Sequence, residues 1–163
     1  MKREIQMLRI LLLLFFLSSC GYKPVNFEKQ KLNVCIEKVN INSPEPLILD
    51  VLNRKLRDVI VSQGKKLDCS YKKNIVVYIT LKSLSFYPIG YSQSQRANVY
   101  KIAMSLNLKV DDKEGSTILN KDITETTQYI GAGLRADIEK RYAIQYLGDL
   151  IQVRIFSLLS QIR

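Results

Sequence analysis

The chain lacks the side chain that most often performs general acid–base catalysis in proteins. It contains no histidine among its 163 residues, which removes the usual general base near neutral pH and the commonest zinc ligand. Histidine-dependent triads and zinc motifs are therefore excluded, and no helical Ser-x-x-Lys motif offers a serine–lysine dyad. We expect no catalytic residue, no metal site and no cofactor, and therefore a protein that is not an enzyme.

Two short motifs that could bind ions have simpler explanations. Asp111, Asp112 and Glu114 form an acidic cluster, but they lack the oxygen-donor spacing of a calcium loop. A glycine follows them, as is typical of a solvated hairpin turn. The Gly-Ala-Gly motif at residues 131–133 is too short for a phosphate-binding loop and predicts a turn from a strand into a helix.

Cys20 is the residue whose surroundings predict a specific covalent chemistry. Leu17 lies three places before it, with two serines between. This spacing resembles the lipobox of bacterial lipoproteins, in which processing leaves the cysteine as a first residue acylated with fatty acids such as palmitate. We therefore predict lipidation at Cys20.

The residues before Cys20 support this prediction. Basic residues at positions 2, 3 and 9 flank an apolar run at residues 10–17, far shorter than the roughly 20 residues of a membrane-spanning helix. We expect residues 1–19 to be a signal peptide that is removed; the alternative is a short buried helix with a chance cysteine. In the bacterial lipoprotein pattern, Gly21 in place of aspartate permits sorting to the outer membrane, so we expect a lipid-anchored protein on its periplasmic face.

The charge balance points to anionic partners. The formal net charge is +10 at pH 7, and such a field attracts phosphate groups. An exported, tethered chain meets the phosphates of lipids and lipopolysaccharide, so we expect no nucleic-acid partner. The alternative is that the lysines only keep the surface solvated.

The remaining chain predicts one tether and one domain. Residues 20–31 are polar and contain a proline, as is typical of a tether, and residues 32–163 carry the periodic patterns of a single α/β domain. The expected elements are a strand beginning near residue 32, a helix from the prolines at 44 and 46 to Gly64, strands at 74–86, 100–110 and 117–129, and a helix after Gly133. The apolar stripe of this last helix, which includes Tyr142 and Tyr146 and is interrupted by Arg154, is expected to lie on the sheet. Residues 67–71 receive no assignment, and residues 88–96 are expected to form a polar loop. A change of phase near Ser83 predicts either a bulge or an end to strand pairing there.

The order β-α-β-β-β-α predicts an α+β fold. We expect a two-layer α/β sandwich with two helices on one face of a mainly antiparallel four-stranded sheet, in which the strand at 117–129 is a candidate edge. The other face of the sheet would remain open, and it would present Tyr78, Lys82, Lys101, Ser105, Asn107 and Lys109.

Two cysteines remain after lipidation of Cys20. In an oxidising periplasm an even pair favours a disulfide, and a strand, a helix and a return segment would bring Cys69 beside the strand that contains Cys35. The alternative is two unpaired thiols. We expect Cys35 and Cys69 as a possible disulfide.

The chain resembles the LptE family, the lipopolysaccharide-assembly lipoproteins of the outer membrane. The resemblance covers nearly the whole mature chain: the Cys-Gly-Tyr start at residues 20–22, the first strand and the helix ending at Gly64, the strand at 100–110 with its acidic turn, and the final amphipathic helix. It implies a lipoprotein that sits inside the LptD-type β-barrel as a plug, helps the barrel assemble, and binds lipopolysaccharide.

The resemblance also implies basic lipopolysaccharide-binding residues before the central strand and near the start of the last helix. The nearest residues here are Arg96 and Arg135, with Lys101 as a weaker candidate. Arginine suits phosphate because its planar fork can donate two hydrogen bonds to it, although each arginine could also only solvate its loop. The rival function is another outer-membrane lipoprotein, such as a secretion pilotin or a lipoprotein-channel component, that binds only protein partners.

Overall fold

The computed structural model describes residues 32–162 apart from residues 41–42, 44 and 71–72. The predicted signal peptide (1–19) and most of the predicted tether (20–31) lie before the first strand. These segments, including Cys20, are outside the described residues, so their assignments stay predictions.

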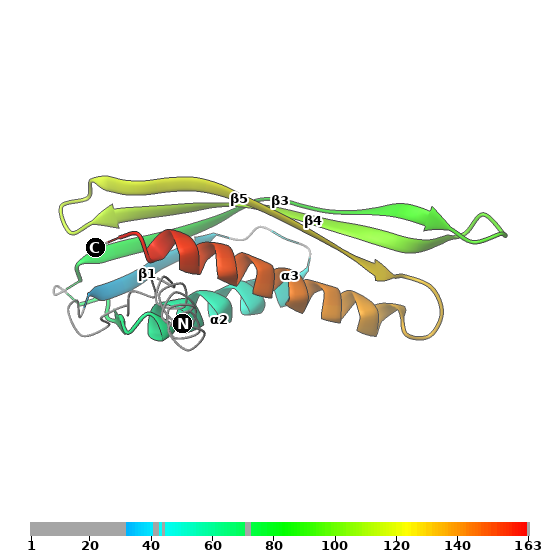
Figure 1. Ribbon diagram of the computed structural model, residues 1–163, viewed down its shortest axis with the longest axis horizontal. Coiled ribbons are helices and arrows are strands. Elements are labelled where there is room, and N and C mark those ends of the chain that lie inside the picture. The colour runs from blue at the N-terminus through cyan, green and yellow to red at the C-terminus, as the bar shows by residue number, and fades with distance from the viewer. Residues whose placement is uncertain (1–31, 41–42, 44, 71–72, 163) are drawn as a thin grey trace, which may run out of the picture.

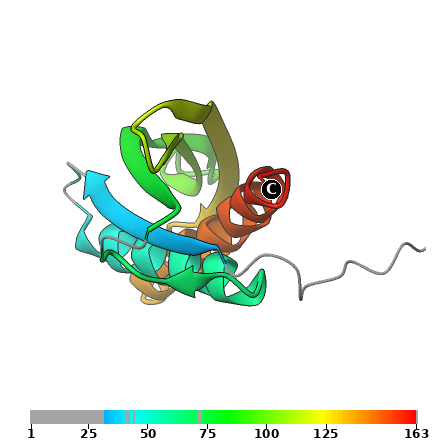
Figure 2. The ribbon, with the colours of Figure 1, turned by 90° about the vertical axis from the view of Figure 1, so that its left-hand side faces the viewer.

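One mixed sheet and two helices make up the described fold. The elements are β1 (Asn33–Asn40), α2 (Pro46–Ser62), β2 (Lys66–Leu67), β3 (Ile75–Tyr91), β4 (Ala97–Asp112), β5 (Thr117–Ile130) and α3 (Ala136–Leu159). The strand order is β2-β1-β3-β4-β5. Both helices lie on the same face of the sheet (Figures 1 and 2), in agreement with the predicted two-layer α+β arrangement.

The prediction of four mainly antiparallel strands is wrong in one respect, because the sheet has five strands and is mixed. β1 is parallel to both of its neighbours, β2 and β3, whereas β4 pairs antiparallel with β3 and with β5. The additional strand, β2, has two residues and is too short to show an alternating pattern. It is defined by main-chain hydrogen bonds, in which Lys66 N donates to Leu32 O at 3.0 Å and Asp68 N donates to Val34 O at 3.0 Å.

β3 is longer than the sequence predicts. It continues to Tyr91 and so includes much of the expected polar loop. Pro88 is tolerated because β1 pairs with β3 only as far as Thr80, so the distal half of β3 is an edge on that side. Of the two alternatives predicted near Ser83, the bulge is present, since the register against β4 shifts between Leu81 and Ser83.

β4 supplies a central row of the side chains that form the core between the sheet and the two helices. Every second residue from position 102 to position 110 faces the helices and is fully or almost fully buried: Ile102, Met104, Leu106, Leu108 and Val110. This alternation of buried and less buried residues in β4 is the one that the sequence predicts for residues 100–110.

The two helices approach one another closely at Gly148, where an added Cβ would lie 2.3 Å from Val51 Cγ1.

The apolar stripe predicted for the last helix is too wide. Ala143, Leu147, Ile151 and Ile155 are buried, but Tyr142 and Tyr146 are 64% and 55% exposed. The sequence pattern misleads here because α3 is apolar on more than one face, so its periodicity alone does not say which apolar side chains meet the sheet.

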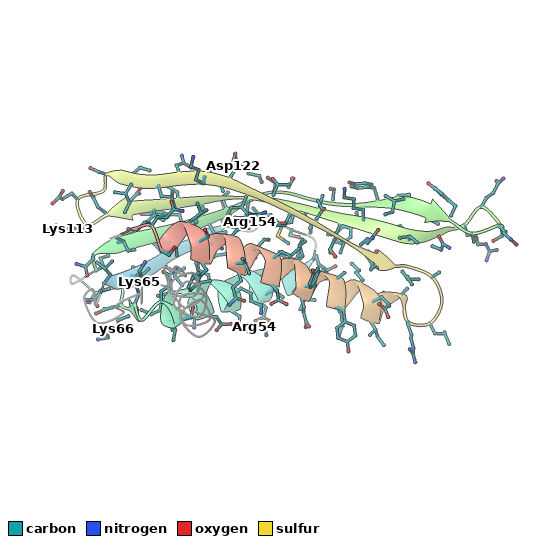
Figure 3. All side chains as sticks on the ribbon, in the orientation of Figure 1. Arg54, Lys65, Lys66, Lys113, Asp122 and Arg154 are labelled. Carbon is teal, nitrogen blue, oxygen red and sulfur yellow. A yellow bond between two sulfur atoms is a disulfide. The ribbon has the colours of Figure 1, made fainter. Side chains whose placement is uncertain are left out.

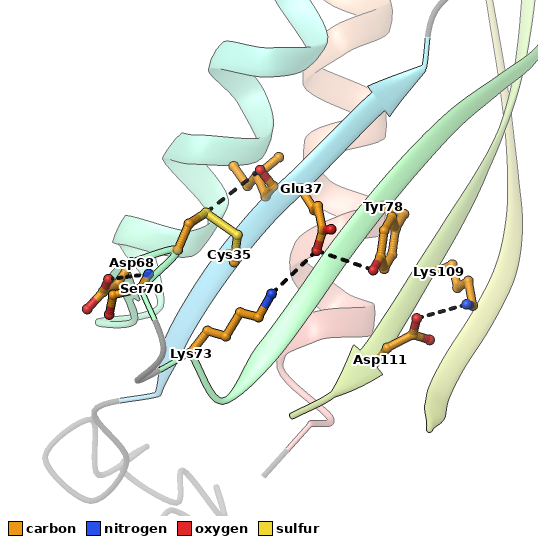
Figure 4. Close-up of polar contacts among 10 residues, drawn as sticks. Cys35, Glu37, Asp68, Ser70, Lys73, Tyr78, Lys109 and Asp111 are labelled. Atoms are coloured by element: carbon orange, nitrogen blue, oxygen red, sulfur yellow. Dashed lines mark hydrogen bonds and ion pairs between the residues drawn. A yellow bond between two sulfur atoms is a disulfide. The ribbon is translucent and has the colours of Figure 1, made fainter. Parts of the chain in front are cut away.

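In the structure Cys35 and Cys69 form a disulfide (Figure 4), with Cα atoms 4.5 Å apart. Cys35 pairs in register with Val76 on the sheet face away from the helices. The bridge therefore joins β1 to the segment that follows β2. It closes a loop with a sequence separation of 34.

We predict that replacing both cysteines, Cys35→Ala with Cys69→Ala, lowers the free energy of unfolding by about 3 to 4 kcal/mol, because the unfolded chain regains the entropy of that loop. Urea unfolding of the variant and the wild-type lipoprotein measures the difference. Ellman titration of the denatured wild-type lipoprotein is the control, and two free thiols there would contradict the bridge.

Candidate functional site

The structure brings two of the predicted binding residues to the same end of the molecule. Arg96 lies directly before β4, in the turn after β3, and Arg135 lies directly before α3. Both connections are at the right-hand end in Figure 1, and the main chain joins them, since Gly131 N donates to Asn98 O at 2.9 Å. We call this end, made by residues 89–99 and 130–135, the distal end.

The turn that carries Arg96 is held by its own hydrogen bonds. Ser92 N donates to Arg96 O at 2.8 Å and Gln95 N donates to Ser92 O at 2.9 Å. Gln95 adopts a positive φ of 57°, a conformation that this tight turn imposes on a residue other than glycine. The backbone is therefore fixed, while the exposed Arg96 side chain has no ion-pair partner within the described part of the chain.

The connection that carries Arg135 is held against two aromatic rings. Tyr100 and Tyr129 stack with their ring centroids 5.5 Å apart, and burial raises the pKa of the Tyr129 hydroxyl. Gly131 packs on this pair so closely that an added Cβ would lie 2.3 Å from Tyr100 Cδ2. Arg135 is exposed and, among the described residues, forms no ion pair.

Lys101 lies close to this end but on a different surface. It pairs in register with Tyr87 of β3 and Gln128 of β5, on the sheet face away from the helices. Its side chain is half-buried. Arg96 and Arg135 thus share the distal end, whereas Lys101 belongs to the adjoining outer face of the sheet.

The distal end also exposes apolar side chains that the sequence analysis did not select. Ile89, Tyr91 and Ile130 are each about half exposed or more, and Leu134 is fully exposed. The sequence analysis did not select them because they lie in a predicted polar loop and beside a predicted glycine turn. The presence of four apolar residues next to turn residues could have indicated an exposed apolar surface. Asp137 and Glu139 lie in the first turn of α3, so this end combines cationic, acidic and apolar groups.

The open outer face of the sheet is polar and largely satisfies its own hydrogen bonds. Lys82 Nζ lies 2.6 Å from Asp122 Oδ2, and Asn107 donates to the other oxygen of that carboxylate. These two donors hold the pKa of Asp122 below its usual range. The residues predicted for this face do lie on it, but most of them form hydrogen bonds or ion pairs with other side chains of the same face.

The same pattern continues toward the disulfide (Figure 4). Lys109 Nζ lies 2.8 Å from Asp111 Oδ2, and its ammonium group is 5.4 Å from the ring centroid of Tyr78. The Lys109 hydrogen bond lowers the pKa of Asp111, which is buried. The predicted acidic cluster is therefore divided. Asp111 pairs with Lys109 of the same strand and accepts a hydrogen bond from Thr117 Oγ1 of β5, whereas Asp112 accepts hydrogen bonds from the turn itself.

A shallow groove of about 350 Å³ lies between β5 and α3. It is lined by residues 121–125 of β5 and by Arg154, Ser157 and Leu158 of α3. Arg154 Nε donates to Glu125 Oε1 at 2.7 Å, which explains why an arginine interrupts the apolar pattern of α3 (Figure 3). The groove contains no buried nucleophile, and no group of three potential metal ligands occurs among the described residues.

Neither described helix is long and apolar enough to span a membrane.

A solved structure of a bacterial lipoprotein shares the fold of this chain. No protein-family model matches the chain, and no curated protein matches its sequence. The rare lipoprotein B of Shewanella oneidensis superposes with a TM-score of 0.56 at 13% identity, covering 79% of this chain and 95% of that one. A minor lipoprotein of Acinetobacter baumannii gives a TM-score of 0.49 at 13% identity, covering 78% and 94%. These neighbours are bacterial lipoproteins, and at this identity the first of them establishes a common fold.

We predict that Gly131→Ala destabilises the protein by about 1 to 3 kcal/mol, because the new methyl group would overlap the Tyr100 ring. Urea unfolding measures the loss. The double variant Gly131→Ala with Tyr100→Ala is the control, since removal of the ring should remove most of the additional cost. An equal cost of Gly131→Ala in both backgrounds would contradict this packing.

Proposed function

We propose that this protein is an outer-membrane lipoprotein of the LptE type, which plugs and helps to assemble an LptD-type β-barrel and binds lipopolysaccharide as that lipid is inserted into the outer leaflet. It acts by binding and performs no catalysis. The lipobox-like sequence at Cys20 and the fold shared with a bacterial lipoprotein support lipid anchoring.

The observation that carries the proposal is the chemistry of the distal end. Arg96 and Arg135 come from connections far apart in the sequence and have no ion-pair partner among the described side chains. Exposed Ile130 and Leu134 lie shortly before Arg135 in the chain, and exposed Tyr91 ends the strand before the Arg96 turn. Guanidinium groups beside exposed apolar groups suit a ligand that is anionic at its head and apolar in its chains, as lipopolysaccharide is.

The outer face of the sheet supports the role of a plug. Its side chains are mostly polar, and the pairs Lys82–Asp122 and Ser105–Thr124 are already hydrogen-bonded. The interiors of membrane β-barrels are polar, so such a face can lie against a barrel wall without burying unpaired groups. In this proposal the outer face of the sheet contacts the barrel wall, and the distal end contacts the lipopolysaccharide.

We predict that the double reversal Arg96→Glu with Arg135→Glu weakens lipopolysaccharide binding about tenfold or more, because two phosphate-binding cations become anions; tenfold corresponds to about 1.4 kcal/mol. Binding of fluorescently labelled lipopolysaccharide to the detergent-solubilised lipoprotein measures the change.

A matched control reverses two cations elsewhere. Arg54→Glu with Lys113→Glu changes the net charge equally, and both residues lie away from the distal end (Figure 3). This control should bind within about twofold of the wild type if position, not net charge, determines affinity. Equal binding by the Arg96 and Arg135 variant and the wild type would refute the assignment.

We further predict that the tagged full-length lipoprotein, extracted in mild detergent, retains a large outer-membrane β-barrel of LptD type. Mass spectrometry of the captured proteins identifies the partner. Retention of a secretin, or of a ring made from this chain, would instead favour the pilotin or lipoprotein-channel function and would overturn the proposal.

A further inference from the structure

One face of α3 is apolar although it points away from the rest of the described fold. Spacings of three and four residues place six side chains on this face: Ile138, Tyr142, Tyr146, Asp149, Val153 and Phe156. Five of the six are large apolar or aromatic residues that are exposed. We call these six residues the back face of α3.

The back face is unusual for a surface helix. The buried residues Leu147, Ile151 and Ile155 lie on the opposite side of α3 and pack against the sheet. A helix at the surface normally carries polar residues opposite its buried stripe. A second apolar face along most of α3 indicates that another surface covers it.

A polar group in the middle of the back face argues against acyl chains as that surface. Asp149 lies between Tyr146 and Val153, and its carboxylate pairs with Lys55 of α2. Placing this ion pair against hydrocarbon would be costly. A protein surface that accepts or donates hydrogen bonds at this point is a better match.

The back face is complementary to itself. Its six positions are spaced almost symmetrically about residues 147 and 148, so two antiparallel copies of α3 would set Ile138 against Phe156 and Tyr142 against Val153. Tyr146 would face Asp149, where its hydroxyl could donate to the carboxylate. Such mutual pairing is the property of a twofold interface, in which each copy uses the same patch.

The flanking positions permit this arrangement. In the antiparallel register, Arg141 would lie opposite Gln152, and Glu139 would lie opposite Ser157. Neither pairing brings like charges together. The five apolar side chains expose on the order of 100 Å² each, so two copies would bury on the order of 1,000 Å², near the lower limit for a specific interface.

We propose that the back face of α3 is a homodimer interface in which two copies of this chain pack their α3 helices antiparallel about a twofold axis near residues 147 and 148. The interface uses neither the distal end nor the outer face of the sheet. A copy that sits inside a barrel as a plug cannot pair its α3 with a second copy, so the dimer forms between copies of the lipoprotein that are outside the barrel. The small area of the interface makes the dimer weak, and it forms where copies are concentrated on a membrane by their anchors.

Cross-linking between two differently tagged full-length copies tests the proposal. One copy carries Tyr142→Cys, the other carries Val153→Cys, and both are expressed together and treated in membranes with a short bis-maleimide. The expected result is a covalent adduct containing both tags.

The matched control replaces Val153→Cys by Val61→Cys, since these two valines are similarly exposed, at 67% and 62%, but Val61 lies on α2. The adduct of positions 142 and 153 should exceed the control adduct at least tenfold. Adding Ile138→Lys to both copies should reduce it at least fivefold, because each lysine would lie against Phe156.

Three outcomes would overturn the proposal. The first is an adduct no more abundant than the control, and the second is an adduct that joins only identical positions, which would mean a different packing. The third is an adduct in which the cysteine at position 142 or 153 is joined to another protein and not to the second copy. That result would assign the back face to the other protein.

Discussion

The register of β3 against β4 is the constraint on which the rest of the structure depends. The pairing runs from Ile75 opposite Asp112 to Tyr91 opposite Ala97, and alternate residues of β4 face the helices or the open side. A slip of one residue would exchange the apolar and polar rows. The bulge between Leu81 and Ser83 takes up one extra residue, so that Leu84 and Phe86 rejoin the apolar row.

The two edges of the sheet are each protected in a different way. β5 places Glu125 opposite Met104, on the helix-facing side, where Arg154 of α3 binds its carboxylate. Charged side chains that point inward on an edge strand disfavour pairing with a further strand. On the other side β2 has only two residues, and the distal half of β3, which β1 does not cover, contains Pro88, which has no N–H to donate to a further strand.

These constraints leave surfaces of three kinds. The outer face of the sheet is polar and internally paired, as in Lys82 with Asp122. The distal end combines unpaired arginines with apolar residues, and the back face of α3 is apolar. The proposed contacts with lipid, barrel and a second copy each use a different one of these surfaces.

The sequence by itself determined the strand pattern of residues 100–110, the change of phase near Ser83, the two helices and the open sheet face, because alternation and helical spacing are local properties of the chain. It also provided Cys20 and a pair of cysteines whose state it left open. Only the tertiary structure decided that β2 joins the sheet, that Cys35 and Cys69 meet, and that Arg96 and Arg135 share one end. It also decided which apolar face of α3 is buried. Each of these depends on contacts between residues far apart in the chain, and a helix with two apolar faces does not reveal by periodicity which of them packs against the sheet.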